Sequence, residues 1–323
     1  MSLQLCSHYD RLALIQFKNS FSLNSDVSYR CSTSYPKTKS WKEGGDCCDW
    51  DGVTCDPVIG RVIGLDLSCS WLYGSLDSNN SLFRLSRLQK LNLAHNNFQS
   101  SEISSEFGKL ESLTHLNLSY SRFSGQVPSE LSYLSKLISL HLYVVEVEVP
   151  TLRGLLQNCT VVQELFFYGV NMSLVNPGLL MNLSSSLTSL HLHSCDLLGK
   201  FPGDILLLPN LQLLQLTRLG VDFPMSNWST TLRHLELVDL IDPTCGNDGA
   251  PPQSQSMPSE EDDSGSGFDW KIIMMGYSFG LVMGLSVGYI VFSGRPQWFV
   301  RMLEQYGPRK AKRSTQRRRG RRN

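Results

Sequence analysis

Polar and aromatic residues recur through the middle of the chain at intervals of 21 to 26 residues, each between two leucines or, once, between Leu165 and Phe167. The main column consists of Asp66, Asn92, Asn117, His141, Phe166, His191, Gln215 and Glu236. Positions two residues away add His115, Tyr143, Tyr168, His193 and His234. A surface that mixes aromatic and polar side chains suits protein or peptide binding. We therefore predict ligand contacts from Asn92, His115, Asn117, His141, Tyr143, Phe166, Tyr168, His191, His193, Gln215 and Glu236, although any single one could be merely a solvated side chain.

The five histidines of these columns raise the question of a metal site. His141 and His191 are two repeats apart, which at strand spacing separates them by about 10 Å. Zinc ligands must lie about 2 Å from the ion, and His191 and His193 would project roughly 7 Å apart along one strand. We expect no metal and no cofactor, and at most a weak pH response from these rings.

Enzyme signatures are absent from the sequence. It contains no phosphate-binding glycine loop, no G-x-S-x-G motif and no kinase Lys/Asp set. The Arg-rich end directly follows a long apolar segment, where such a run acts as a topology signal and contacts anionic lipid rather than nucleic acid. We expect neither an enzyme nor a nucleic-acid-binding protein.

The elements that position the columns follow from an internal repeat. The pattern L-x-x-L-x-L, with Val at the first position of two units and Phe at the last position of one, begins at residues 62, 88, 113, 137, 162, 187, 211 and 232. This period lies in the range of leucine-rich repeats. Each x-L-x-L-x stretch predicts a short strand with leucines inward and the columns outward, and a G-x-Φ-P half-repeat (Φ, apolar) turns the chain back. The prediction is an α/β leucine-rich-repeat solenoid whose core forms only when the coils stack.

The residue that occupies the asparagine position of each repeat predicts that some coils are less regular than others. An asparagine there satisfies buried backbone between coils, and the second unit has Asn96. The other units have Ser70, Ser121, Val145, Val170, Cys195, Leu219 and Leu240. Because Val and Leu cannot donate hydrogen bonds, we expect the second half to be less regular and less stable.

Cysteines and glycosylation sequons indicate an oxidising, extracellular compartment. Five of the nine cysteines lie in the first 55 residues. Six N-x-S/T sequons occur, at Asn79, Asn117, Asn158, Asn171, Asn182 and Asn227. Asn117 falls on a predicted strand, where a glycan would obstruct binding, whereas Asn79, Asn158 and Asn182 fall outside the strands and are the more favourable sites.

The 21 uncharged residues Ile272–Phe292 predict a transmembrane helix, since at 1.5 Å per residue they span about 30 Å. Four glycines in register form a groove for a second helix: Gly276, Gly280, Gly284 and Gly288. After Phe292 the net charge is +10, and the rest of the chain has a net charge of −10, which places the C-terminus inside. We predict a single-pass type I plasma-membrane protein with its N-terminus extracellular. No signal peptide is visible in Met1–Asp10, so it has been lost or lies upstream of this sequence.

The ends of the chain resemble a known family. Cys6-x-x-x-Asp10, Trp41 and the segment Cys47-Cys48-Asp49-Trp50-Asp51-Gly52-Val53-Thr54-Cys55 resemble the N-terminal cap of plant extracellular leucine-rich-repeat proteins. Residues 268–304, with the glycine series and Trp298-Phe299-Val300-Arg301, resemble Cf-type plant receptor-like proteins that detect pathogens. The resemblance implies the disulfides Cys6–Cys47 and Cys48–Cys55. Cys31 and Cys69 pair with each other or stay free, and Cys159 and Cys195 are expected as reduced core residues.

The resemblance implies a domain order and a function. We expect a cap (1–61), about eight repeats (62–243), an acidic linker (244–270), a transmembrane helix (271–293) and a basic cytoplasmic tail (294–323). The family has some twenty or more repeats, a paired-cysteine C-terminal cap and a non-repeat island, so this chain looks shortened. The expected protein is a kinase-less defence receptor that binds a protein or peptide and signals through a leucine-rich-repeat receptor kinase at the glycine face. The alternatives are a membrane-tethered decoy or regulator, and an inhibitor of a microbial wall-degrading enzyme.

Overall fold

The structure, a computed structural model, describes residues 6–223 and 229–240. The predicted linker, transmembrane helix with Gly276, Gly280, Gly284 and Gly288, basic tail, and sequon at Asn227 lie outside these residues. In the part of the chain that is described, no helix combines the length and apolar character needed to cross a membrane.

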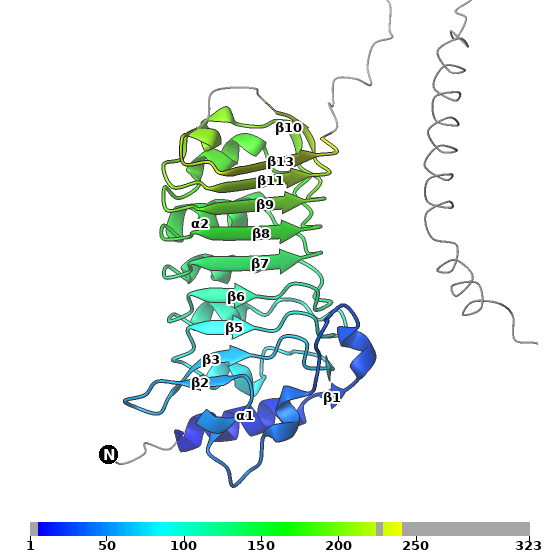
Figure 1. Ribbon diagram of the computed structural model, residues 1–323, viewed down its shortest axis with the longest axis vertical. Coiled ribbons are helices and arrows are strands. Elements are labelled where there is room, and N and C mark those ends of the chain that lie inside the picture. The colour runs from blue at the N-terminus through cyan, green and yellow to red at the C-terminus, as the bar shows by residue number, and fades with distance from the viewer. Residues whose placement is uncertain (1–5, 224–228, 241–323) are drawn as a thin grey trace, which may run out of the picture. The chain divides into compact units, whose positions relative to one another are not determined.

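The described residues form a ladder of coils built on one large sheet (Figure 1). Its nine strands follow the order β13-β11-β9-β8-β7-β6-β5-β3-β2, and all neighbours from β3 to β13 are parallel. The cap strand β2 pairs antiparallel with β3 and covers that edge of the sheet. The strands are β2 (Val53–Cys55), β3 (Val62–Asp66), β5 (Lys90–Asn92), β6 (His115–Asn117), β7 (Ser139–Tyr143), β8 (Glu164–Tyr168), β9 (Ser189–His193), β11 (Leu213–Thr217) and β13 (His234–Val238).

Helices and short strands return the chain from one coil to the next. Two minor sheets pair β1 (Ser22–Leu23) with β4 (Leu72–Tyr73) and β10 (Leu198–Lys200) with β12 (Gly220–Asp222). The α-helices are α1 (His8–Asn19) and α2 (Val149–Asn158). The 3-10 helices are η1 (Ser25–Ser28), η2 (Lys37–Ser40), η3 (Cys47–Asp49), η4 (Ser81–Arg84), η5 (Ser105–Lys109), η6 (Ser129–Tyr133), η7 (Pro177–Asn182) and η8 (Gly203–Leu207). Pro128 and Pro202, from the G-x-Φ-P half-repeats, stand immediately before η6 and η8.

The strand register places equivalent residues of every repeat side by side. Asp66 pairs with Asn92, Asn92 with Asn117, and the series continues through His141 to Glu236. Leucines of the alternate positions, such as Leu140, Leu165 and Leu190, are buried. A shift of one residue would turn these leucines outward, so the leucine pattern fixes the register. We call the outward-facing side of β3 to β13 the exposed sheet face.

Several buried polar side chains donate hydrogen bonds to backbone carbonyls of the coils. Asn96 Nδ2 donates to the carbonyls of Leu67 and Leu93, at 2.8 and 2.9 Å, and its Oδ1 accepts from the Leu72 amide at 3.0 Å. Ser121 Oγ donates to the Leu93 carbonyl at 2.6 Å, and Cys195 Sγ to that of Phe167 at 3.2 Å. These bonds tie three of the coils to the one before.

The second half is not less regular in its strand pairing, contrary to the expectation from the sequence. In the large sheet, β7, β8, β9, β11 and β13 contain five residues each, whereas β5 and β6 contain three. Val145, Val170 and Leu219, at the asparagine position, are buried as apolar residues. The ladder hydrogen bonds and apolar packing therefore maintain the pairing without the asparagine.

The cap covers the first coil through one face of α1. Ala13, Leu14 and Phe17 are buried there, and the rings of Trp41 and Trp50 stack at 5.4 Å. Two disulfides, Cys6–Cys47 and Cys48–Cys55, join segments of the cap, and a third, Cys31–Cys69, joins the cap to the first repeat. The last pair settles the question that the sequence left open. Cys159 and Cys195 are free and buried, as expected, and burial raises the pKa of their thiols to about 11 and about 12.

Candidate functional site

The first part of the exposed sheet face forms an open groove of about 700 Å³ across β2 to β8. Four predicted ligand-binding residues line it: Asn92, His115, Asn117 and His141. Lys90 and Glu164 also line it, so the groove offers both charge signs. Sequence reasoning did not select these two, although the same outward alternation of the strands would have identified them.

At one end of the groove, the cap contributes a charge to the sheet. Lys37 Nζ lies 3.3 Å from Asp66 Oδ1 and donates to the Asp66 carbonyl at 3.0 Å. Burial alone would raise the pKa of Asp66, but hydrogen bonds from Ser68 and the charge of Lys37 outweigh burial and lower the pKa. The Asp66 carboxylate therefore stays ionised, and this end of the groove carries the Lys37–Asp66 ion pair.

A stack of rings continues the main column beyond the groove; we call it the central ladder. The ring centroids of His141 and Phe166 are 4.1 Å apart, and those of Phe166 and His191 are 3.9 Å apart. His191 Nδ1 lies 2.6 Å from Gln215 Oε1, which extends the series by one more strand. Parallel strands repeat at about 4.8 Å, so rings at equivalent positions must either stack or turn away from each other. Here they stack, which fixes their rotamers.

A second stack, the outer ladder, runs along the ends of the strands. Successive centroid distances are 4.8 Å for His95–Tyr120, 4.1 Å for Tyr120–Tyr143, 5.0 Å for Tyr143–Tyr168 and 4.1 Å for Tyr168–His193. Because each ring covers its neighbour's face, ring edges and polar atoms are left for a ligand. Such half-buried, rigid aromatic side chains lose little conformational entropy on binding.

The histidines of this face are biased toward their neutral form. Burial is the main cause that lowers the pKa of His95, His115, His141, His191 and His193. Nearby cations add to the effect, Lys90 at His115 and Arg218 at His193. Glu164 opposes it at His141 and His191. Near pH 7 these rings therefore act as aromatic surfaces and neutral hydrogen-bonding groups.

Glu236 lies at the far edge of the sheet, on β13. Its Oε2 is 3.6 Å from His234 Nε2, and Glu236 is the register partner of Gln215, where the central ladder ends. The structure thus places the predicted binding residues in three groups: the groove, the two ladders and this edge pair.

Tyr120 and His95 were missed because they lie outside the strands. Each occupies the position after a strand where the backbone turns left-handed, with φ of 53° and 58°. The equivalent residues in other coils share this conformation, including Val144 (φ 50°) and Gly169 (φ 62°). The inward and outward alternation of a strand does not predict where a side chain beyond the strand points. Only the recurrence of this position in every repeat could have indicated that Tyr120 and His95 join the outer ladder.

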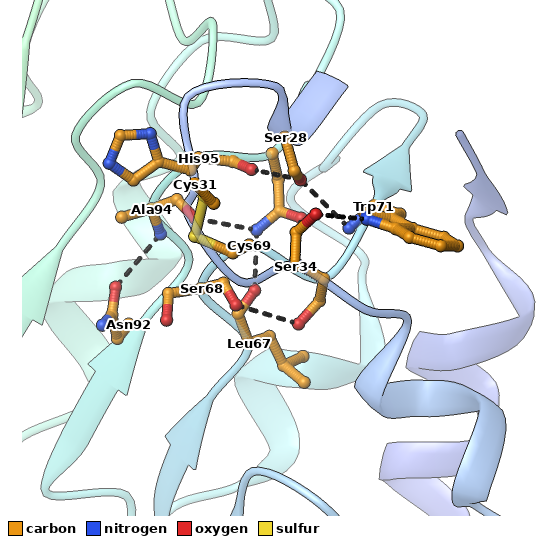
Figure 2. Close-up of a disulfide and its surroundings, with 12 residues drawn as sticks. Ser28, Cys31, Ser34, Leu67, Ser68, Cys69, Trp71, Asn92, Ala94 and His95 are labelled. Carbon is orange, nitrogen blue, oxygen red and sulfur yellow. Dashed lines mark hydrogen bonds between the residues drawn. A yellow bond between two sulfur atoms is a disulfide. The ribbon is translucent and has the colours of Figure 1, made fainter. Parts of the chain in front are cut away.

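The disulfide Cys31–Cys69 fixes a loop of the cap beside the start of the outer ladder (Figure 2). Ser28 Oγ donates to the His95 carbonyl at 2.7 Å, and Trp71 Nε1 donates to Ser34 Oγ at 3.0 Å. The loop also places Arg30 over Tyr120, with Cζ 5.3 Å from the ring centroid.

Four cysteine sulfur atoms of the cap lie close enough together to suggest a metal site, but they do not form one. The Sγ atoms of Cys6, Cys47, Cys48 and Cys55 lie within 4.8 Å of one another. All four belong to disulfides and so offer no thiolate to an ion. Three histidines of the sheet, His141, His191 and His193, are engaged in ring stacks.

The sequons within the described residues differ in their surroundings. Asn117 is half-buried on β6, and its Oδ1 accepts a hydrogen bond from Ser119 Oγ at 2.7 Å. Asn171 is exposed, and its Oδ1 accepts a hydrogen bond from Ser173 Oγ at 2.8 Å. Asn79, Asn158 and Asn182 are exposed outside the large sheet. Glycosylation of any of these sites stays a prediction.

A solenoid of parallel-stranded coils closed by a disulfide-bonded cap defines this protein as a plant-type leucine-rich-repeat ectodomain. Family models agree: a leucine rich repeat N-terminal domain matches residues 7–56, and the Leucine Rich Repeat matches 87–110 and 112–134. Neither model describes an enzyme.

The homologues of this chain are plant receptor-like proteins, which confirms the resemblance stated from the sequence. Receptor-like protein 6 of Arabidopsis thaliana is 42% identical over 252 residues, or 73% of this chain and 25% of the relative. Receptor-like protein Cf-9 of Solanum pimpinellifolium is 44% identical over 252 residues, or 73% of this chain and 29% of the relative. The matched part of the chain thus spans between 25% and 29% of the length of these two relatives. Among solved structures, Pollen Receptor Kinase 3 is 22% identical with a TM-score of 0.46, covering 62% of this chain and 90% of that chain.

Proposed function

We propose that this chain is a kinase-less cell-surface receptor-like protein that binds a protein or peptide ligand on its exposed sheet face. The observation that carries the proposal is the continuity of that face, where the groove passes into the central ladder at His141. The groove offers opposite charges, and the ladder offers rigid aromatic edges. Side chains of a peptide lying across the parallel strands would meet both kinds of contact.

Signalling in this proposal requires a partner. A leucine-rich-repeat receptor kinase would pack its transmembrane helix on the face formed by Gly276, Gly280, Gly284 and Gly288. Similarity to Cf-9 supports a role in plant defence at the plasma membrane, with residues 294–323 in the cytoplasm. The sequons supply sites for glycosylation of the extracellular part.

A peptide-display selection on the full chain tests the binding face. Peptides selected on the wild-type chain should bind Phe166→Ala at least about tenfold more weakly, since truncating a central aromatic contact costs about 2 kcal/mol. Tyr133→Ala is the matched control, because Tyr133 is 65% exposed on η6, outside the sheet. Equal binding to wild type and Phe166→Ala, or a loss confined to Tyr133→Ala, would contradict the proposal.

Co-purification with candidate receptor kinases tests the helix partner. Gly280→Leu with Gly284→Leu should reduce recovery of the kinase, because added side chains prevent close helix approach. The control, Ser278→Leu with Val282→Leu, alters the opposite side of the same predicted helix. Undiminished recovery with the glycine variant would refute the helix interface and leave ligand binding to be judged separately.

A further inference from the structure

A second pocket, of about 350 Å³, lies between the cap and the start of the outer ladder, and we call it the cap pocket. Its lining includes Asp26, Tyr29, Arg30, His95, Tyr120 and Arg122. It shares none of its lining residues with the groove, so it does not depend on the function proposed above. From this arrangement we infer that the cap pocket binds an acidic peptide segment, with a carboxylate held by Arg30 and Arg122.

The charge of the cap pocket favours an anion. Among the described residues, neither Arg30 nor Arg122 has a carboxylate within salt-bridge distance. Asp26 is the acidic group of the lining, and its Oδ1 accepts from Ser25 Oγ at 3.4 Å. His95 adds no positive charge near pH 7, because burial and then the charge of Arg30 lower its pKa. Two guanidinium groups against one carboxylate leave a net positive pocket.

Arg30 is oriented in advance. Its Nε donates to Tyr29 Oη at 3.0 Å, and its Cζ lies 5.6 Å from the Tyr29 ring centroid as well as 5.3 Å from that of Tyr120. The terminal Nη donors form no hydrogen bond with another described side chain and are free for a bidentate contact. A guanidinium on an aromatic face is weakly hydrated and loses less freedom on binding than a lysine would. The hydrogen bond to Tyr29 raises the pKa of Arg30, so its charge is permanent.

The loop that carries Arg30 is itself fixed to the first repeats. Cys31, the next residue, is bonded to Cys69 (Figure 2). Ser28 Oγ donates to the His95 carbonyl at 2.7 Å, and the Asn24 amide to the Trp71 carbonyl at 2.8 Å. Because these bonds hold both flanks of Arg30, the pocket keeps its form without a ligand. A preformed site pays less entropy on binding.

The peptide acetyl-Asp-Gly-Glu-Gly-Asp-amide is the probe, with acetyl-Asn-Gly-Gln-Gly-Asn-amide as its neutral counterpart. The full chain, labelled for NMR of both arginine Nε–H and histidine ring signals, is titrated with each peptide at low salt. We expect the acidic peptide to shift the Arg30 and Arg122 signals and to bind at least about tenfold more tightly than the neutral one. Equal binding of the two peptides would overturn the inference. So would shifts confined to the His141 ring, which would place the peptide in the groove and leave the proposed function standing.

Variants give a second, independent test. Arg30→Gln combined with Arg122→Gln should weaken binding of the acidic peptide at least about tenfold. Arg153→Gln, an exposed arginine on α2, should leave it unchanged. Arg30→Lys keeps the charge but loses the planar stack, and should bind several-fold more weakly than wild type. Equal affinity of the wild-type chain and the double variant would overturn the assignment, and the wild-type NMR titration decides the matter if the double variant does not fold.

Discussion

Arg61 Nε donates to Asp10 Oδ2 at 2.8 Å, and the same oxygen accepts from the Val62 amide at 2.9 Å. Asp10 lies on α1 and is 1% exposed, whereas Val62 begins β3. One buried carboxylate therefore holds the cap helix against the first strand of the solenoid. Breaking a buried pair leaves an unpaired charge, so this contact is needed for docking the cap even if it adds little net stability.

Asp10→Asn should lower the free energy of unfolding by about 2–3 kcal/mol, since it removes a charge-assisted bond and leaves Arg61 without its carboxylate. Urea denaturation measures the change. Glu106→Gln, which removes the exposed ion pair with Lys109, should change stability by less than about 0.5 kcal/mol. A loss for Asp10→Asn no larger than that of the control would contradict this role.

The disulfides should differ in their contribution to stability. Cys31–Cys69 spans 38 residues and Cys48–Cys55 spans 7. Loop-closure entropy predicts that replacing both cysteines by serine costs about 4 kcal/mol for the first pair and about 2 kcal/mol for the second. Guanidinium denaturation under non-reducing conditions compares the two double variants, and the reverse order would disprove the entropic explanation.

The leucine pattern was sufficient to predict which residues share the exposed sheet face, because buried leucines allow one strand register. It could not predict that His141, Phe166 and His191 stack, since stacking depends on rotamers. Tyr120 escaped prediction because its left-handed backbone lies beyond the strand. The Cys31–Cys69 bond depends on how the cap loop folds over the first repeat, which sequence spacing does not determine.

Stability should fall on mild acidification. Burial lowers the pKa of His141 and His191 in the folded state below the unfolded value of about 6.5. The unfolded chain then binds more protons, so the free energy of unfolding is highest above about pH 6.5 and decreases as pH falls toward the folded values. His191→Phe keeps the ring and removes the titration. Urea unfolding at about pH 7.5 and about pH 5.5 should show a smaller decrease for this variant than for wild type; an equal decrease would exclude His191 as a contributor.

Val144 offers a stabilising substitution. Val144 is β-branched and 51% exposed, and its backbone is in the left-handed region at φ 50°. The equivalent residue of the next coil is Gly169, at φ 62°. Val144→Gly should raise the free energy of unfolding by roughly 1 kcal/mol by removing side-chain strain. Val161→Gly, also exposed, lacks a positive φ and should lose about 0.5–1 kcal/mol. Thermal denaturation distinguishes the two, and destabilisation by both would rule out strain at Val144.

The shared register of the coils has a consequence for how such a surface can diversify. Loss of one whole unit, for example the one that carries β8, would bring β7 beside β9 with every leucine still inward. His141 would then meet His191, and Tyr143 would meet His193, with no ring rotated out of line. Unequal recombination between repeats can therefore shorten or lengthen the two ladders in whole-ring steps while the fold is conserved.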